Sequence, residues 1–274
     1  MTQYERRYVE LIRRILETGE GRDGRNGPTI ALFAEKLEVN CNLMHELPLL
    51  NGRKMYPKGI LGEFAAFIRG PKHVSDFERW GCNYWKQWAK EDGTIELDYG
   101  NSWFDFNGTD QVRDLVSSLQ NDPHGRRHLI SGWRPDRLAE VDLPCCHMLY
   151  QWYVTNEGKL DMIWYQRSVD VMVGLPSDVL LAAIFNICLA EEVDLIPGKL
   201  TFMLGDCHIY GVHKEGVIKY LDQVEGASDK YAEYNWTSNY KYAELLTGNL
   251  PFEPSMIQLS NYNPQPSIAF EVVA

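Results

Sequence analysis

Three short stretches carry thiol and guanidinium groups that could do chemistry together. Residues 144–147 read PCCH, and a cysteine beside cationic groups can ionise below its ordinary pKa of about 8.5 and act as a nucleophile. Arg126-Arg127 and Arg167 would supply such cations at the starts of strands. Each stretch also has a simpler explanation, because buried cysteines fill cores and surface arginines form ion pairs.

Two carboxyl groups occur in apolar surroundings. Glu63 lies within ILGEFAAFIRG, a predicted buried helix, and a buried carboxyl group is costly unless it has a partner or a task. Asp178 follows the turn GLPS at the start of a long apolar run. Its simplest role is a helix cap, because Ser and Asp oxygens accept hydrogen bonds from the first turn of a helix.

The surrounding patterns predict an α+β chain that would position these groups. Apolar residues at helical spacing predict helices over 4–17, 60–70, 109–122 and 177–193, the last of them central and buried. Aromatic and β-branched residues predict strands over 29–39, 126–133, 147–168 and 199–212, with NEG as a hairpin turn. The Gly-rich, cationic segment 19–29 is expected to be a loop. We expect one domain over residues 1–274, with an extended sheet packed by helices.

Composition narrows the class of protein. The 274 residues are 45% hydrophobic and 12% aromatic, which is enough for a substantial core. The formal charge of −11 argues against a nucleic-acid partner. Six cysteines without CxxC or paired-His spacing argue against a metal site. With neither a signal peptide nor an apolar stretch of roughly 20 residues, we expect no membrane partner and a cytoplasmic protein.

The order of the motifs resembles the thymidylate synthase family, which includes the pyrimidine hydroxymethylases. Along nearly the whole chain come an Arg-rich loop, a buried-helix Glu, WxxWA, YGxxW, RR, PxCH, QRSxDVxxGLPxx, GDxHIY and an apolar tail. The resemblance implies a large twisted mixed β-sheet packed by helices, with one sheet face forming a homodimer interface. It also implies one-carbon transfer from 5,10-methylenetetrahydrofolate to C5 of a pyrimidine nucleotide.

By this resemblance Cys146 adds to C6 of the base, Tyr99 serves removal of the C5 proton, and Glu63 relays protons through ordered water. The phosphate would be held by Arg25, Arg167, Arg126 and Arg127, the last two reaching into the neighbour's site. The loop GRDGRNGPT differs in length from the family's, so Arg22 competes with Arg25. Gln166 and Ser168 would line the nucleotide pocket, and His208 and Tyr210 would hold the sugar.

The folate side of the site is implied in the same way. Asp170 would accept hydrogen bonds from the pterin, and Trp85 and Trp88 would form its stacking wall. Gly174 and Val273 would complete this part of the site.

Asp178 gains a second interpretation from the resemblance. Synthases carry an asparagine here, which accepts from uracil N3–H and donates to O4. Cytosine presents an acceptor at N3 and a donor at N4, and a protonated carboxyl group can match both. An ionised Asp178 would instead set its lone pairs against O4 of uracil, and such a mismatch can discriminate by about 10⁴-fold. We therefore expect dCMP rather than dUMP as substrate.

The product depends on what attacks the exocyclic methylene left on the base: hydride gives a methyl group and water a hydroxymethyl group. Several residues depart from the synthase pattern on the folate side and suggest better access for water. They are Gly62, Ala66, Ser177, Ala269 and Glu271. We predict a dCMP 5-hydroxymethylase, with a dCMP 5-methyltransferase, a thymidylate synthase acting on dUMP and a non-enzymatic nucleotide binder as alternatives.

Overall fold

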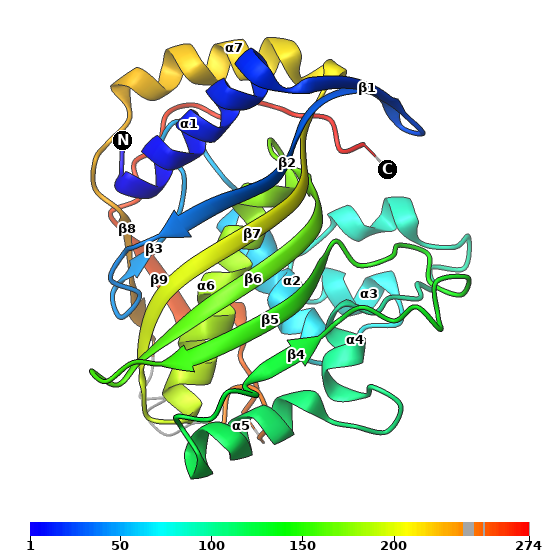
Figure 1. The fold of residues 1–274 in the computed structure, drawn as a ribbon, viewed down its shortest axis with the longest axis vertical. Coiled ribbons are helices and arrows are strands. Elements are labelled where there is room, and N and C mark those ends of the chain that lie inside the picture. Colours follow the sequence, from blue (N-terminus) through cyan, green and yellow to red (C-terminus); the bar gives the residue numbers. More distant parts are fainter. Residues whose placement is uncertain (238–243, 249, 274) are drawn as a thin grey trace.

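A six-stranded mixed sheet with the order β1-β2-β7-β6-β5-β4 forms the middle of the fold (Figure 1). The structure is a computed structural model and describes residues 1–237, 244–248 and 250–273. The strands are β1 (Glu20–Gly24), β2 (Gly27–Val39), β4 (Leu129–Ser131), β5 (His147–Val154), β6 (Lys159–Asp170) and β7 (Ile196–Tyr210). Strands β6 and β7 run parallel, and the other neighbours are antiparallel. The predicted mixed sheet is confirmed.

Helices and a second sheet surround this sheet. The α-helices are α1 (Gln3–Thr18), α2 (Pro57–Phe67), α3 (Val74–Glu78), α4 (Tyr99–Phe104), α5 (Gln111–Asn121), α6 (Gly174–Glu192) and α7 (Lys214–Gln223). Short 3₁₀ turns are η1 (Tyr84–Trp88), η2 (Gly211–His213), η3 (Val224–Gly226) and η4 (Pro254–Met256). The small sheet consists of β3 (Glu46–Leu47), β8 (Ala232–Trp236) and β9 (Ile257–Ser260). Helices α2 and α6 lie behind the large sheet in Figure 1.

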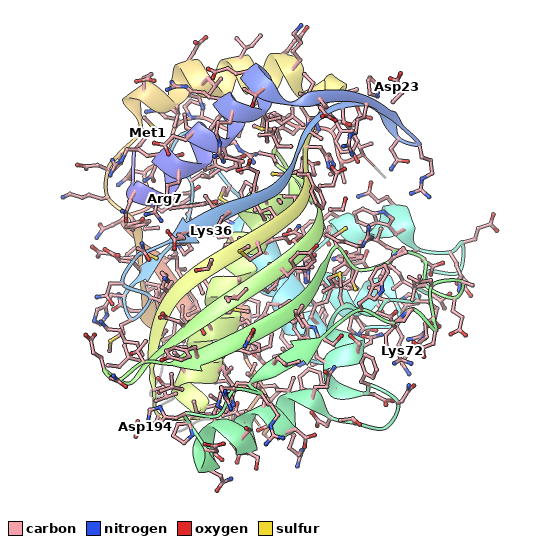
Figure 2. All side chains as sticks on the ribbon, in the orientation of Figure 1. Met1, Arg7, Asp23, Lys36, Lys72 and Asp194 are labelled. Carbon is pink, nitrogen blue, oxygen red and sulfur yellow. The ribbon has the colours of Figure 1, made fainter. Side chains whose placement is uncertain are left out.

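Helix α6 is the apolar centre of the fold, as predicted. It packs against α2, β6 and β7, and side chains fill the space between these layers (Figure 2). By length and composition α6 could cross a membrane, but 78% of its most apolar window is buried inside the protein. The burial explains its hydrophobicity without a membrane, because a helix that is apolar all round must be covered on every side.

The opposite face of the large sheet is open and carries apolar side chains. Leu149, Ile163 and Met203 on the central strands are 38–43% exposed, and Tyr153 and Phe33 are 65% and 73% exposed. Strand pairing puts Leu149 opposite Tyr165, and Tyr165 opposite Met203. The patch therefore continues across three neighbouring strands.

Two local structures differ from those predicted from the sequence. The segment expected to be a loop over 19–29 is a hairpin, in which β1 pairs with the start of β2 around a turn at Arg25-Asn26. Gly27 has φ +103°, a conformation that favours glycine, and this allows the tight reversal. The predicted strand over 126–133 is also shorter and forms only β4.

Candidate active site

A cavity of about 1200 Å³ opens at the ends of β6 and β7. Its walls come from α2, η1, the start of α6, the β1–β2 turn and the C-terminal tail, whose last residue, Ala274, lies outside the described residues. The residues predicted from the sequence that line it are Arg25, Glu63, Trp85, Trp88, Tyr99, Cys146, Gln166, Arg167, Ser168, Asp170, Gly174, Asp178, His208, Tyr210 and Val273. Side chains more than 200 residues apart in the chain thus face one space.

Strand register explains why the polar side chains meet. Gln166, Ser168 and Asp170 alternate along β6 and so share one of its faces. The parallel pairing with β7 puts Asp170 opposite His208, and the antiparallel pairing with β5 puts Gln166 opposite His147. The three central strands therefore deliver the nucleotide-pocket candidates to one end of the sheet.

Cys146 lies in the segment that leads into β5, next to two further candidates. Its backbone N–H donates to the Tyr99 hydroxyl over 3.0 Å. Burial raises the pKa of the Cys146 thiol, while the charge of Arg167 opposes that rise. The predicted influence of Arg167 therefore has the expected sign, but burial outweighs it in the structure without a ligand.

Two of the predicted phosphate-binding arginines, Arg25 and Arg167, line the cavity. Arg167 donates through Nε to the Cys145 carbonyl and through Nη2 to the Pro144 carbonyl, each over 2.9 Å, which fixes its guanidinium beside Cys146. Arg25 lines the cavity from the β1–β2 turn. Arg22 instead pairs with Asp206 at 3.2 Å and Glu20 at 3.6 Å. Of the two competing loop arginines, Arg25 is therefore the one available to a ligand.

Asp178 does not cap α6. The helix begins at Gly174, its N-cap residue Val173 makes no side-chain cap, and Asp178 lies one turn further on. Its Oδ2 accepts from Gln166 Nε2 over 2.7 Å. The turn before the helix is held instead by Asp170, whose Oδ1 accepts from the N–H groups of Met172 and Val173 at 2.9 and 3.1 Å. The cap interpretation of Asp178 is wrong because the helix begins four residues before it.

Burial, followed by the nearby charge of Glu63, raises the pKa of Asp178 well above its usual value. This environment therefore favours the neutral form of the Asp178 carboxyl group. The hydrogen bond from Gln166 opposes the rise without cancelling it.

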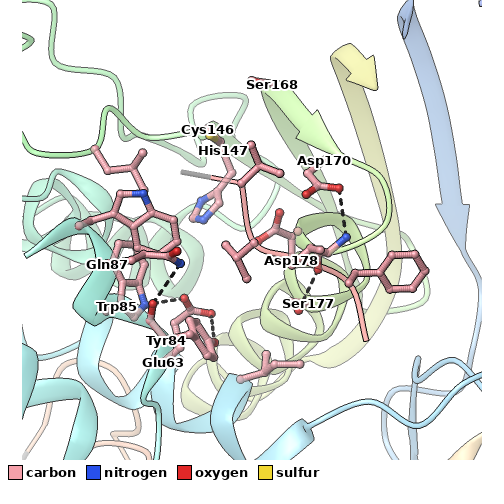
Figure 3. A pocket seen from close by; sticks show the side chains of 18 of the residues that line it. Glu63, Tyr84, Trp85, Gln87, Cys146, His147, Ser168, Asp170, Ser177 and Asp178 are labelled. Carbon is pink, nitrogen blue, oxygen red and sulfur yellow. Dashed lines mark hydrogen bonds between the residues drawn. The ribbon is translucent and has the colours of Figure 1, made fainter. Parts of the chain in front are cut away.

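Glu63 sits on the face of α2 that also presents Ile60 and Phe67 to the cavity. Its Oε1 accepts from Trp85 Nε1 and its Oε2 from the Tyr84 hydroxyl, each over 2.8 Å (Figure 3). Burial raises the pKa of Glu63 to about 7, and the two hydrogen bonds limit the rise. A carboxyl group with such a pKa can both take up and release a proton near neutral pH.

The far wall is aromatic and polar, as an extended heteroaromatic ligand requires. The rings of Trp85 and Trp88 lie 5.1 Å apart, and Trp85 stacks on Phe77 at 5.0 Å. Asp170 faces these rings across the cavity, and Gly174 leaves room beside it. The residues that were assigned to folate therefore face one another across the cavity, with aromatic rings on one side and a carboxyl group on the other, and this fits such a ligand.

Three of the five departures from the synthase pattern are not among the described lining residues of the cavity. Ser177 and Ala269 line it, whereas Gly62 and Ala66 are buried and Glu271 is exposed. A Cβ on residue 62 would lie 2.4 Å from the Trp80 carbonyl oxygen. The small residue at 62 thus serves close packing and does not open the cavity to water.

Arg126 and Arg127 are the site candidates that this chain does not bring to its own cavity. Both are exposed, just before β4. Other residues line the cavity but were not predicted from the sequence, above all Tyr84 and Arg53. Arg53 is only 9% exposed and packs over the Phe270 ring of the tail at 4.9 Å. A basic residue just before a buried helix was the signal that could have pointed to it.

Within residues 1–237, 244–248 and 250–273, no group of three or more His, Cys, Asp and Glu side chains is arranged to hold a metal ion. The six cysteines are free thiols.

Replacing Glu63 with Gln should change how stability depends on pH. The folded-state pKa of about 7 lies above the ordinary value of 4.5, so the folded state holds this proton more tightly than the unfolded state. The contribution of Glu63 is therefore lost as pH rises from about 4.5 to 7, by at most roughly 3 kcal/mol. The unfolding free energy of the wild type, measured with urea, should fall relative to that of Glu63→Gln over this range. A constant difference between the two proteins would contradict the assignment.

Two comparisons identify the family. The thymidylate synthase family model matches residues 6–274. The chain is also 34% identical over 277 residues to the thymidylate synthase of Corynebacterium aurimucosum, and the match covers 99% of this chain and 98% of that protein. The predicted resemblance is thereby confirmed at the level of the family, and this chain belongs to the thymidylate synthase family.

Proposed function

We propose that this enzyme converts dCMP to its 5-hydroxymethyl derivative. Members of the thymidylate synthase family are one-carbon transferases that use methylenetetrahydrofolate as co-substrate. The finer assignment of base rests on one observation, a buried aspartic acid at the base-reading position. Asp178 faces the cavity, and its environment favours the neutral form.

The neutral form matters because cytosine requires one donor and one acceptor. A neutral carboxyl group can donate to N3 and accept from the N4 amino group, whereas a carboxylate offers only acceptors. Gln166 Nε2 occupies Oδ2 as a donor, which favours the proton on Oδ1. Gln166 thereby fixes the order of donor and acceptor that Asp178 presents. The Asp in place of the synthase asparagine is what supports cytosine over uracil.

The remaining residues have defined tasks in the reaction. The Cys146 thiolate would add to C6 of the base, with Arg167 opposing the effect of burial on its ionisation. The Tyr99 hydroxyl, at 3.0 Å from the Cys146 nitrogen, would serve removal of the C5 proton. Glu63 would move protons through water, which its pKa near 7 supports. The co-substrate would bind between Trp85 and Asp170 and supply the one-carbon unit.

Water capture is supported by Ser177. Its side chain lines the cavity where synthases place a phenylalanine, and its hydroxyl donates to the Val173 carbonyl at 3.3 Å. A small polar side chain covers less of the folate side than a phenyl ring. Methylation of dCMP is the second candidate, because Trp85 and apolar tail residues such as Ile268, Phe270 and Val272 also line the cavity and could exclude water.

We also propose that the enzyme acts as a homodimer across the open face of the large sheet. An apolar patch across three central strands is a surface that a second copy can cover. Arg126 and Arg127 are exposed and remote from the chain's own cavity, which fits a role in the partner's phosphate site. The arrangement would make each site depend on both chains.

The assignment of base predicts separate outcomes for dCMP and dUMP. With methylenetetrahydrofolate, the wild type should turn over dCMP far faster than dUMP, and the product should be heavier than the methylated nucleotide by one oxygen. Asp178→Asn should reverse the preference by at least about 10³-fold, because the amide presents the uracil pattern. Mass spectrometry of the nucleotides measures both effects, with Cys146→Ala as the inactive control.

Three results would each overturn one part of this assignment. Efficient wild-type turnover of dUMP would overturn the choice of base. Dihydrofolate formed together with a methylated cytosine would overturn water capture. Tight nucleotide binding without turnover of either substrate would leave a binding protein.

Shared sites predict complementation between two inactive variants. Cys146→Ala lacks the thiol, and the double variant Arg126→Ala, Arg127→Ala lacks the shared cations. Random reassortment of equal amounts makes half of the dimers mixed, and each mixed dimer has one complete site. Activity should therefore recover to about a quarter of the wild-type value. Dimerisation is checked by sedimentation, and no recovery from a mixed, dimeric sample would rule out sharing.

A further inference from the structure

Tyr84 makes a contact with Glu63 to which the proposed reaction has assigned no task. It is the first residue of η1, is partly buried and lines the cavity. Tyr84 and Trp85 are consecutive, and together they donate to the two different oxygens of Glu63 (Figure 3). A carboxyl group that accepts a hydrogen bond at each oxygen cannot rotate freely.

Gly62 makes this grip possible. A Cβ at this position would lie 2.4 Å from the Trp80 carbonyl oxygen, so only glycine lets the segment before η1 approach α2 this closely. The Gln87 amide further steadies η1 by donating to the Tyr84 carbonyl over 3.2 Å. Gly62 therefore lets the segment before η1 pack close to α2, and this packing brings Tyr84 into contact with Glu63.

We propose that Tyr84, admitted by Gly62, is a positioning residue that orients the Glu63 carboxyl group and helps set the pH range of turnover. The proposal rests on the proposed function, in which Glu63 moves protons. It adds a residue that does not touch the reacting atoms and acts through Glu63.

The direction of the Tyr84 hydrogen bond follows from its surroundings. Burial, and next the charge of Glu63, raises the pKa of Tyr84 well above its usual value, so the phenol keeps its proton and donates. The other titratable groups facing Glu63 are Asp178 from α6 and the Cys82 thiol, whose pKa burial raises. Among the described residues, no cation contributes to the pKa of Glu63. The phenol and the indole are thus the groups that favour its ionised form.

Tyr84→Phe keeps the ring and removes the hydroxyl, which also forms a hydrogen bond with the Cys82 thiol. The pKa of Glu63 should then rise by about one unit, since a hydrogen bond to an ionised group changes its ionisation constant roughly tenfold. Carboxyl-labelled glutamate followed by NMR measures the titration on the protein alone, and Glu63→Gln identifies the signal. The limb of the kcat–pH profile that reports Glu63 should move by the same amount, while KM for the nucleotide changes less than about twofold.

Two further variants complete the test. Tyr234→Phe removes a buried phenol that donates to the Leu43 carbonyl over 2.8 Å, away from the cavity, and should leave the titration unchanged. Gly62→Ala should displace the segment before η1. It should therefore raise the pKa of Glu63, as Tyr84→Phe does. An unchanged Glu63 titration in Tyr84→Phe would overturn the proposal. If the wild type turned over neither nucleotide, the proposed function would fail while the NMR titration still decided the role of Tyr84.

Discussion

Two buried carboxyl groups, Glu63 and Asp178, face one cavity, and the rest of the site is arranged around the cost of charging them. Burial raises the pKa of both, and a negative Glu63 raises that of Asp178 further. Arg167 is held beside the thiol, whereas Arg53 lines the cavity next to the tail and packs over Phe270. Burial thus favours the neutral form of both carboxyl groups, and Arg167 opposes the effect of burial on the thiol.

The strands and helices around the cavity set the positions of these groups. The parallel register of β6 with β7 puts Ser168 and Asp170 beside Asp206 and His208, and α6 brings Asp178 over Gln166. Helix α2 carries Glu63 from the other side, where η1 grips it. The apolar α6 is buried and packs against α2, β6 and β7, the elements that carry Glu63 and the nucleotide-pocket residues.

Much of this could be predicted from the sequence, because its signals are local or ordered along the chain. The apolar character of α6, the alternation in β5 to β7 and the order of motifs around Cys146 identified site residues most of which line one cavity. Two features could not be predicted, for different reasons. Asp178 carried the signature of a cap, but the helix begins four residues earlier, at Gly174. Tyr84 gave no signal, because its role comes from Gly62 admitting its segment to α2.

The neutral state of Asp178 is the central claim, since the reading of cytosine follows from it. Infrared difference spectroscopy between the wild type and Asp178→Asn at pH 7 observes that state directly, without substrate or turnover. The account predicts that the wild type shows the carbonyl band of a neutral carboxylic acid that the variant lacks. The paired bands of an ionised carboxylate, lost on substitution, would contradict it.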